Sequence, residues 1–207
     1  TRVSKSTAED WEKLRRLLKY LHRTIDMPRI LAATSLQSIH TWVDASYAVH
    51  NDMRSHTGGV MSLGRGVINA KSTKQKLNTK SSTEAELVEI DDALKYIMWG
   101  LYFVQAKDFN IKKNILKQDN KSTILMANNR RFSCTKRTKH IKNRYFLIKD
   151  KIRQGEVVIQ YCSTNDMRAD INTKPLQGGL MRARLMGISE DYHDDLKCEN
   201  THSSLLP

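Results

Sequence analysis

A chain of 207 residues is long enough for one ordinary domain with extensions, and a domain of that size folds without disulfides or structural metals. The three cysteines (Cys134, Cys162 and Cys198) are widely spaced and odd in number, which argues against a disulfide framework or a zinc site. They favour a reducing compartment, cytoplasmic or nuclear, over secretion. The net charge of +13 and the pI near 9.7 favour a nucleic-acid partner, with an acidic membrane or protein surface as the alternative.

The first predicted element is an amphipathic helix over residues 7–24. Thr7 is a plausible N-cap, Asp10 completes a capping box, and apolar residues recur at helical spacing from Trp11 to Leu21. We interpret residues 1–30 as a connector to an upstream domain. The missing initiator Met suggests a fragment of a longer protein. No secretory signal is visible, and no apolar run approaches the roughly 18 residues that cross a bilayer.

The next elements are predicted to be three short strands in antiparallel order, over residues 39–44, 58–63 and 67–70, followed by a basic loop over residues 71–80. A long helix is expected from Ser81 to Ala106 and a fourth strand from Asn114 to Gln118. Helices over 122–128 and 137–154, a strand over 156–162 and a last helix over 165–174 complete the domain. This order predicts one mixed α/β sheet covered by helices over residues 36–184, with a flexible polar tail over 185–207.

Four acidic residues fall where their side chains can meet at one edge of such a sheet. Asp44 and Asp119 end the first and fourth strands, while Glu86 and Asp170 lie in the long and last helices. Clustered carboxylates are the hard oxygen ligands that suit Mg²⁺ or Mn²⁺. Two such ions about 3.5–4 Å apart activate a water and stabilise the leaving oxygen in phosphodiester cleavage. Taken one at a time, each acid is explained better as a helix cap or a turn residue.

The long helix carries other acids, and its apolar stripe separates them. Glu86 lies roughly 60° from the centre of that stripe and Glu84 roughly 100° away on the other flank, so Glu86 is nearer the sheet. Glu84 is expected to support the start of the helix. Glu89 is treated as a bystander, and Asp91 and Asp92 as solvated helix acids.

Six motifs in this order resemble one family. They are Asp44-Ala-Ser-Tyr-Ala, Arg54-Ser-His-Thr-Gly58, Lys74-Gln-Lys-Leu-Asn-Thr-Lys-Ser-Ser-Thr-Glu-Ala-Glu86-Leu, Gln118-Asp-Asn-Lys-Ser122, Lys136-Arg-Thr-Lys-His-Ile141 and Ala169-Asp-Ile-Asn-Thr-Lys-Pro-Leu176. Over about residues 10–180 the chain resembles the C-terminal part of copia-type LTR retrotransposon Pol polyproteins, which contains the ribonuclease H (RNase H) domain. The helix from Trp11 to Leu21 resembles the end of the reverse transcriptase or its connection to RNase H.

The resemblance implies an RNase H-like fold, a five-stranded mixed sheet with strands 1 to 3 antiparallel. It implies two Mg²⁺ ions, or Mn²⁺, held by Asp44, Glu86, Asp119 and Asp170, and hydrolysis of the RNA strand of RNA–DNA hybrids. Matched by motif, Asp44 and Asp119 hold both ions, Glu86 the ion near the leaving group, and Asp170 the ion beside the attacking water. The implied partners are the hybrid and the upstream reverse transcriptase domain, with no membrane.

The chain departs from that family pattern in the loop before the last acidic helix. Cellular RNases H often carry a His there, whereas residues 163–168 contain none, which leaves Asn165 or Asp166 for product release, or no residue. Asn172 stands where many relatives have an apolar residue, which puts the local packing in question. His140 lies in a different element, where a phosphate contact or packing is the simpler role.

Substrate contacts are expected from two groups of residues. Amide and hydroxyl side chains near the groove suit the 2′-hydroxyls of an RNA strand, and basic ones suit its phosphates. The candidates are Gln75, Asn78, Ser81 and Asn120 for the hydroxyls, and Lys136, Arg137, Lys139 and His140 for the backbone.

Two alternatives stay open. Asp44, Asp119 and Glu156 have roughly the spacing of an integrase core, but that chemistry uses a Glu on a helix, and Glu156 is predicted to open a strand. The other alternative is a non-catalytic, nucleic-acid-binding remnant of a retrotransposon polyprotein, which the presence of all four carboxylates disfavours.

Overall fold

The computed structural model describes residues 5–26, 31–128 and 139–176, and only the backbone of residues 139–143. The helices are α1 (Ala8–Arg23), α2 (Ser82–Gln105), α3 (Lys121–Asn128) and α4 (Lys139–Arg153), with 3₁₀ helices η3 (Thr164–Asp166) and η4 (Arg168–Asn172). The strands are β1 (Ala32–Ala33), β2 (Ser38–Ser46), β3 (His56–Ser62), β4 (Gly64–Arg65), β5 (Asn69–Lys74), β6 (Lys113–Gln118) and β7 (Val158–Tyr161). The predicted tail over 185–207 lies outside the described residues.

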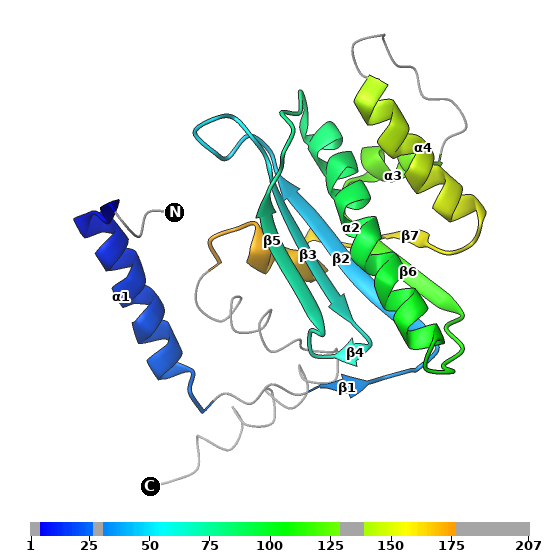
Figure 1. Cartoon of the computed structure of the whole chain (residues 1–207), viewed down its shortest axis with the longest axis horizontal. Helices are drawn as coiled ribbons and strands as arrows, with labels where there is room; N and C mark the ends of the chain where they lie inside the picture. Colours follow the sequence, from blue (N-terminus) through cyan, green and yellow to red (C-terminus); the bar gives the residue numbers. More distant parts are fainter. Residues whose placement is uncertain (1–4, 27–30, 129–138, 177–207) are drawn as a thin grey trace, which may run out of the picture.

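Five of these strands form one mixed sheet, in the order β5-β3-β2-β6-β7 (Figure 1). The pairs β2–β3 and β3–β5 are antiparallel, whereas β6 runs parallel to β2 and β7 parallel to β6. The chain therefore enters the sheet as a meander and then returns through helical crossovers, as parallel pairing requires. The predicted α/β class and the RNase H-like topology are confirmed.

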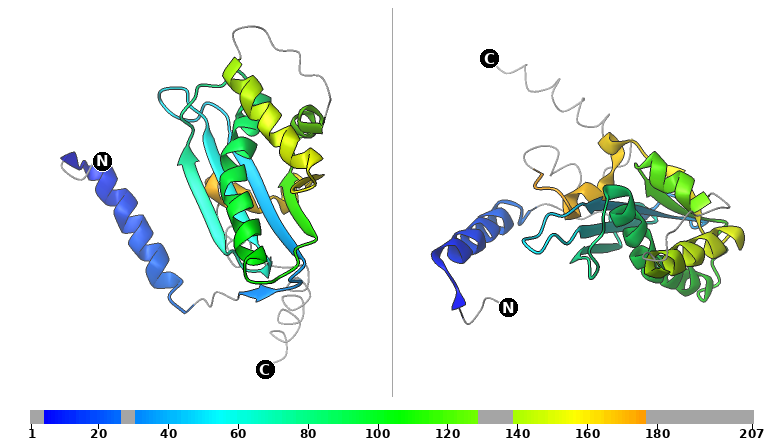
Figure 2. Two further views of the ribbon diagram at one scale, coloured as in Figure 1. Left: turned by 45° about the vertical axis from the view of Figure 1, so that its right-hand side comes forward. Right: turned by 90° about the horizontal axis from the view of Figure 1, so that it is seen from above.

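The two faces of the sheet carry different cores because side chains alternate along each strand. Ile39, Val43 and Leu116 pack with α2 and α4 in the larger core. Trp42 lies on the opposite face, where it packs with Met167 and Ala169 near η4. Figure 2 shows α2 and α4 on one side of the sheet and the two 3₁₀ helices on the other.

Several predicted boundaries are wrong, each for a physical reason. The basic segment Lys71–Lys74 belongs to β5 instead of a loop, because this edge strand pairs only with β3 and leaves most of its side chains in solvent. The predicted last helix over 165–174 is two separate 3₁₀ turns, since Met167 between them has an extended backbone (ψ 95°). The strand through Asp44 continues to Ser46. The small sheet of β1 and β4 was not predicted.

The N-terminal helix α1 has the predicted capping box, with Thr7 and Asp10 bonded to each other's backbone. None of its residues is buried, and its apolar stripe, including Trp11 at 64% exposure, faces solvent. The division into connector, domain and tail stays a prediction. Within the described residues, no helix is long and apolar enough to cross a membrane.

Candidate metal centre

The site forms where two parallel strands stop pairing. The register of β2 with β6 ends at Trp42 opposite Lys117. Asp44 and Asp119 each lie two residues beyond that last pair, so they occupy equivalent positions where β2 and β6 separate, Asp44 within β2 and Asp119 directly after β6. In α/β sheets this end, where neighbouring strands separate, is where ligands bind.

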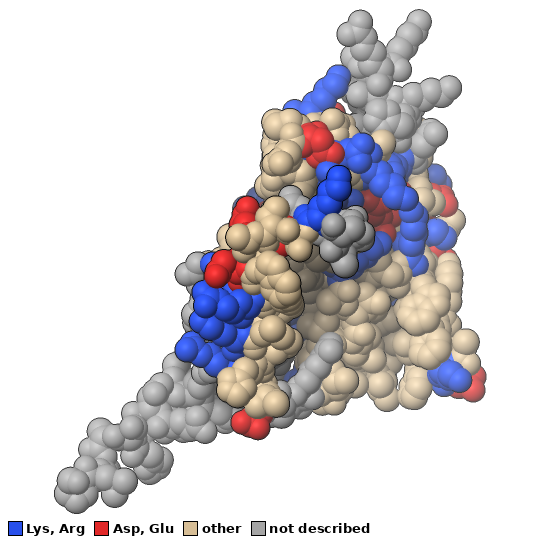
Figure 3. Space-filling model, turned by 60° about the vertical axis from the view of Figure 1, so that its left-hand side comes forward, with Lys and Arg blue, Asp and Glu red and all other residues tan. Residues whose placement is uncertain are grey.

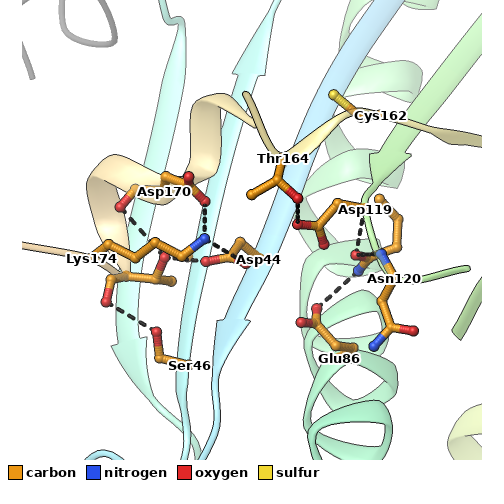
Figure 4. Close-up of polar contacts among 12 residues, drawn as sticks. Asp44, Ser46, Glu86, Asp119, Asn120, Cys162, Thr164, Asp170 and Lys174 are labelled. Atoms are coloured by element: carbon orange, nitrogen blue, oxygen red, sulfur yellow. Dashed lines mark hydrogen bonds and ion pairs between the residues drawn. The ribbon is translucent and has the colours of Figure 1, made fainter. Parts of the chain in front are cut away.

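Three of the four predicted carboxylates converge at this point. Asp44, Glu86 and Asp119 each offer an oxygen, and these atoms lie within 4.8 Å of one another (Figure 4). Asp44 comes from β2, Asp119 follows β6, and Glu86 reaches the site from the second turn of α2. Asp44 and Glu86 are buried, at 4% and 5% exposure, and Asp119 is half-buried. Their assignment as metal ligands stays a prediction.

The protein neutralises the cluster only in part, because Lys174 Nζ lies 3.8 Å from Asp44 Oδ1. Burial, reinforced by the nearby Asp44 carboxylate, raises the pKa of Glu86 to about 8. Burial also raises the pKa of Asp44, against an opposing hydrogen bond from the Thr173 hydroxyl. Among the described residues, no Lys or Arg forms an ion pair with Glu86 or Asp119. A divalent cation therefore fits this donor set, because clustered carboxylates ionise together only beside positive charge.

Gln118, which the sequence reasoning missed, holds two of these carboxylates in place. It is fully buried, and its Nε2 donates to Glu86 Oε2 at 3.0 Å. Its Oε1 accepts from the backbone N–H of Asp119 at 2.7 Å and of Asn120 at 2.9 Å. One amide thus fixes both the Glu86 side chain and the turn that carries Asp119. The only signal in the sequence was a polar residue at a strand position next to the acid.

Asp170 lies apart from the three-carboxylate group. It is buried in η4, and its Oδ1 accepts from Lys174 Nζ at 2.7 Å. Lys174 Nζ also lies 3.8 Å from Asp44 Oδ1, so the lysine bridges Asp170 and Asp44. The residue before Lys174, Thr173, donates its hydroxyl to the other Asp44 oxygen. The Thr173 carbonyl accepts from Ser46 Oγ. The predicted fourth ligand is thus close to Asp44, with an ammonium between them.

Glu89, which was predicted to be a bystander to the metal site, is buried beside it. It is fully buried, and its Oε1 accepts from the backbone N–H of Gly58, the β3 residue opposite Asp44. Burial, reinforced by the Glu86 and Asp44 charges, raises the pKa of Glu89 well above its ordinary value. Its position three residues after Glu86 placed it on the same side of the helix, which is the signal that was overlooked.

The acids further along α2 also differ from expectation. Asp91 is only 6% exposed and both Asp91 and Asp92 pair with Arg144 of α4. The prediction of two solvated acids is wrong for Asp91, because α4 packs over this part of α2 and covers it. Glu84 does support the helix start as predicted, accepting from the Lys80 N–H at 2.8 Å while Ser81 caps Glu84.

The residues predicted to contact the substrate differ in their burial and in their hydrogen bonds. Gln75 is 2% exposed and donates to Thr57 and to the Ala85 carbonyl, so the prediction that it contacts a substrate is wrong. Its amide instead ties β5 to α2. Asn78 and Ser81 are exposed, and Asn120 caps α3 through the Thr123 N–H. Lys136 and Arg137 lie outside the described residues, as do the side chains of Lys139 and His140.

The structure shows which contacts form at the two places where the sequence departs from the family pattern, Asn172 and the loop before η4. Asn172 donates from Nδ2 to the Gly59 carbonyl at 2.9 Å, so it anchors the end of η4 to β3 by a hydrogen bond instead of apolar packing. Asp119 Oδ2 accepts from Thr164 Oγ1 at 3.1 Å, which places the loop before η4 against the cluster.

Comparison with known proteins identifies relatives for most of the chain. It is 30% identical over 172 residues to the retrovirus-related Pol polyprotein from transposon RE2 of Arabidopsis thaliana, a match that covers 82% of this chain and 12% of that protein. It is 30% identical over 167 residues to the Pol polyprotein from transposon TNT 1-94 of Nicotiana tabacum, covering 80% of this chain and 12% of that protein. The Ty1-JR2 Gag-Pol polyprotein of Saccharomyces cerevisiae is 32% identical over 143 residues, covering 64% and 8%.

No family model matches the sequence. Among solved structures, LC11-RNase H1, isolated from compost, is similar with a TM-score of 0.48 and 14% identity, covering 66% of this chain and 92% of that one. The plant and yeast relatives match the chain along most of its length, and the chain spans about 12% of the plant polyproteins. The chain belongs to the Pol polyproteins of copia-type LTR retrotransposons.

Proposed function

We propose that this segment is the ribonuclease H of its polyprotein, which hydrolyses the RNA strand of RNA–DNA hybrids during reverse transcription. The observation that carries the proposal is the convergence of Asp44, Glu86 and Asp119 within 4.8 Å at the end of the sheet. The family and the RNase H-like topology support it. The proposed cofactor is Mg²⁺, with Mn²⁺ as a substitute, because hard carboxylate oxygens suit both ions.

The four acidic residues would provide ligands for two ion positions. Asp44, Glu86 and Asp119 would hold one ion, and Asp44 with Asp170 would hold another. Bound ions of this kind activate a water and stabilise the leaving oxygen of a phosphodiester. Gln118 orients Glu86 and the Asp119 turn through its three hydrogen bonds, and Thr164 restrains Asp119.

The net charge supports a nucleic-acid substrate. On the face in Figure 3, Lys and Arg side chains gather in separate groups, at the left and the upper right of the view. Such groups neutralise phosphates without reading sequence. Asn78 and Ser81, which stay exposed beside the start of α2, are the proposed contacts to 2′-hydroxyls.

The integrase alternative requires the Glu156 carboxylate to lie beside Asp44 and Asp119, and the contacts of Glu156 argue against this. Glu156 accepts from Tyr102 Oη at 3.0 Å and pairs with Lys151 at 2.7 Å. Tyr102 lies 16 residues after Glu86 on the continuous helix α2, which is about 24 Å along its axis. Glu156 is therefore at the far end of α2 from Asp44 and Asp119.

The test is a cleavage assay with purified chain and labelled strands. With Mg²⁺ we expect cleavage of the RNA in a hybrid and none of single-stranded RNA or duplex DNA. Binding of the hybrid without cleavage would favour the non-catalytic alternative, and joining of DNA ends would favour the integrase alternative. Addition of EDTA should abolish cleavage while leaving hybrid binding measurable by gel shift.

A further inference from the structure

The four acidic residues of the site are neutralised unequally. Lys174 Nζ lies 2.7 Å from Asp170 Oδ1 and 3.8 Å from Asp44 Oδ1. Among the described residues, no cationic side chain pairs with Glu86 or Asp119. One part of the site therefore lacks positive charge, whereas the other part already contains an ammonium (Figure 4).

The backbone around Lys174 keeps its ammonium in this place. The Lys174 N–H donates to the Asp170 carbonyl at 2.8 Å, closing a helical turn that puts the two side chains on one side. Thr173 Oγ1 donates to Asp44, and the Thr173 carbonyl accepts from Ser46 Oγ at 3.1 Å. The segment from Asp170 to Lys174 is thus fastened to β2 through Thr173, the residue directly before the lysine.

We propose that the Lys174 ammonium is the resident cation between Asp44 and Asp170, and that a second divalent ion enters there only by displacing it. The inference rests on the proposed metal site. The two positions then fill in order: the Asp44, Glu86 and Asp119 cluster takes the first ion, and the Asp44 and Asp170 pair takes the second at a higher concentration. Lys174 thereby determines how much more weakly the second ion binds than the first.

Electrostatics and space both support this order. Two cations that share the same carboxylate oxygens compete, since each repels the other at a separation of a few ångströms. The side chain of Lys174 is 38% exposed, whereas those of Asp44 and Asp170 are 5% and 8% exposed. The lysine therefore has solvent into which it can move, and the two acids stay behind as ligands.

The test is a titration of metal-free protein with Mn²⁺ alone, in the absence of nucleic acid, followed by electron paramagnetic resonance and calorimetry. The wild type should bind one ion tightly and a second more weakly. Lys174→Met should tighten the second ion at least about tenfold and change the affinity for the first ion much less, because the lysine lies between the two ligands of the second position. Lys174→Arg should resemble the wild type because it keeps the charge, and Lys95→Met, at an exposed lysine of α2, is the control for the change in net charge.

A second measurement uses the wild-type chain and does not depend on how the variants fold. Lysine acylation followed by mass spectrometry should find Lys174 protected without metal and reactive at the Mn²⁺ concentrations that fill the second position. Lys95, whose side chain is 78% exposed, should react equally throughout.

Unchanged second-ion affinity in Lys174→Met, or unchanged acylation of Lys174 across the titration, would overturn this inference and leave the proposed function standing. A wild-type chain that binds no Mn²⁺ would contradict the metal site itself, and the inference with it. Because no hybrid is present, failure of RNA cleavage in a separate assay does not affect either result.

Discussion

Replacing Gln118 with Leu tests whether a single buried amide organises the site. Leu is similar in size and apolar, so the substitution removes the hydrogen bonds to Glu86, Asp119 and Asn120 and leaves the packing volume nearly unchanged. Each buried partner left without a hydrogen bond costs about 1–3 kcal/mol. The two backbone N–H groups are only partly buried and regain some water, so we expect a total loss of about 2–4 kcal/mol.

The assay is urea denaturation of metal-free protein, with Gln160→Leu as the matched control. Gln160 lies on the neighbouring strand β7, is exposed, and accepts from Lys117 Nζ at 3.0 Å, so its loss should change the free energy of unfolding by less than about 0.5 kcal/mol. Gln118→Leu should also weaken the first Mn²⁺ ion, because Glu86 and the Asp119 turn lose their common support. Equal stability of the two variants, with unchanged Mn²⁺ affinity, would refute the role given to Gln118.

Three further substitutions probe the surroundings of the site. Arg144→Met leaves the buried Asp91 carboxylate without its cationic partner and should lower the free energy of unfolding, measured in urea, by about 2–3 kcal/mol. A loss below about 0.5 kcal/mol would show that this ion pair does not stabilise the fold. Gly58→Ala places a Cβ 2.5 Å from Thr173 Cγ2 and should cost about 1–3 kcal/mol by the same assay. Burial and a neighbouring imidazole lower the pKa of His56 below 6.5, so the folded state takes up this proton less readily and loses stability as the pH falls below about 6.5. His56→Gln should lose less stability than the wild type between pH 7.5 and 5.5, and identical losses would exclude this residue as a source of acid sensitivity.

Much of the fold followed from periodicity and from the order of the elements. The short run Ile39 to Asp44 and the long apolar stripe beginning at Leu87 predicted β2 and α2 within one or two residues. The convergence of Asp44 and Asp119 also followed, because each was expected to end a strand and such residues can meet at one edge of a sheet.

The parts that sequence did not predict depend on tertiary contacts. Lys71–Lys74 has no apolar pattern, and it becomes a strand only because β3 offers an unpaired edge. Asp91 looks solvated on an isolated helix, and its burial becomes apparent only once α4 and Arg144 are in place. The predicted helix over 165–174 already allows the i,i+4 pair of Asp170 and Lys174, but the approach of the Lys174 ammonium to Asp44 depends on the packing of this segment against β2.

The most direct test of the proposed ribonuclease H is single-turnover cleavage of an RNA–DNA hybrid by Asp119→Asn. Asp150→Asn is the matched control, since this exposed aspartate of α4 lies outside the cluster and its Oδ2 accepts from Gln154 at 2.7 Å. The proposal predicts that Asp119→Asn loses at least about 10³-fold in rate, a loss comparable to removing a main electrostatic contribution to catalysis, while Asp150→Asn cleaves like the wild type. Cleavage at the wild-type rate by Asp119→Asn would contradict the carboxylate cluster as the catalytic centre.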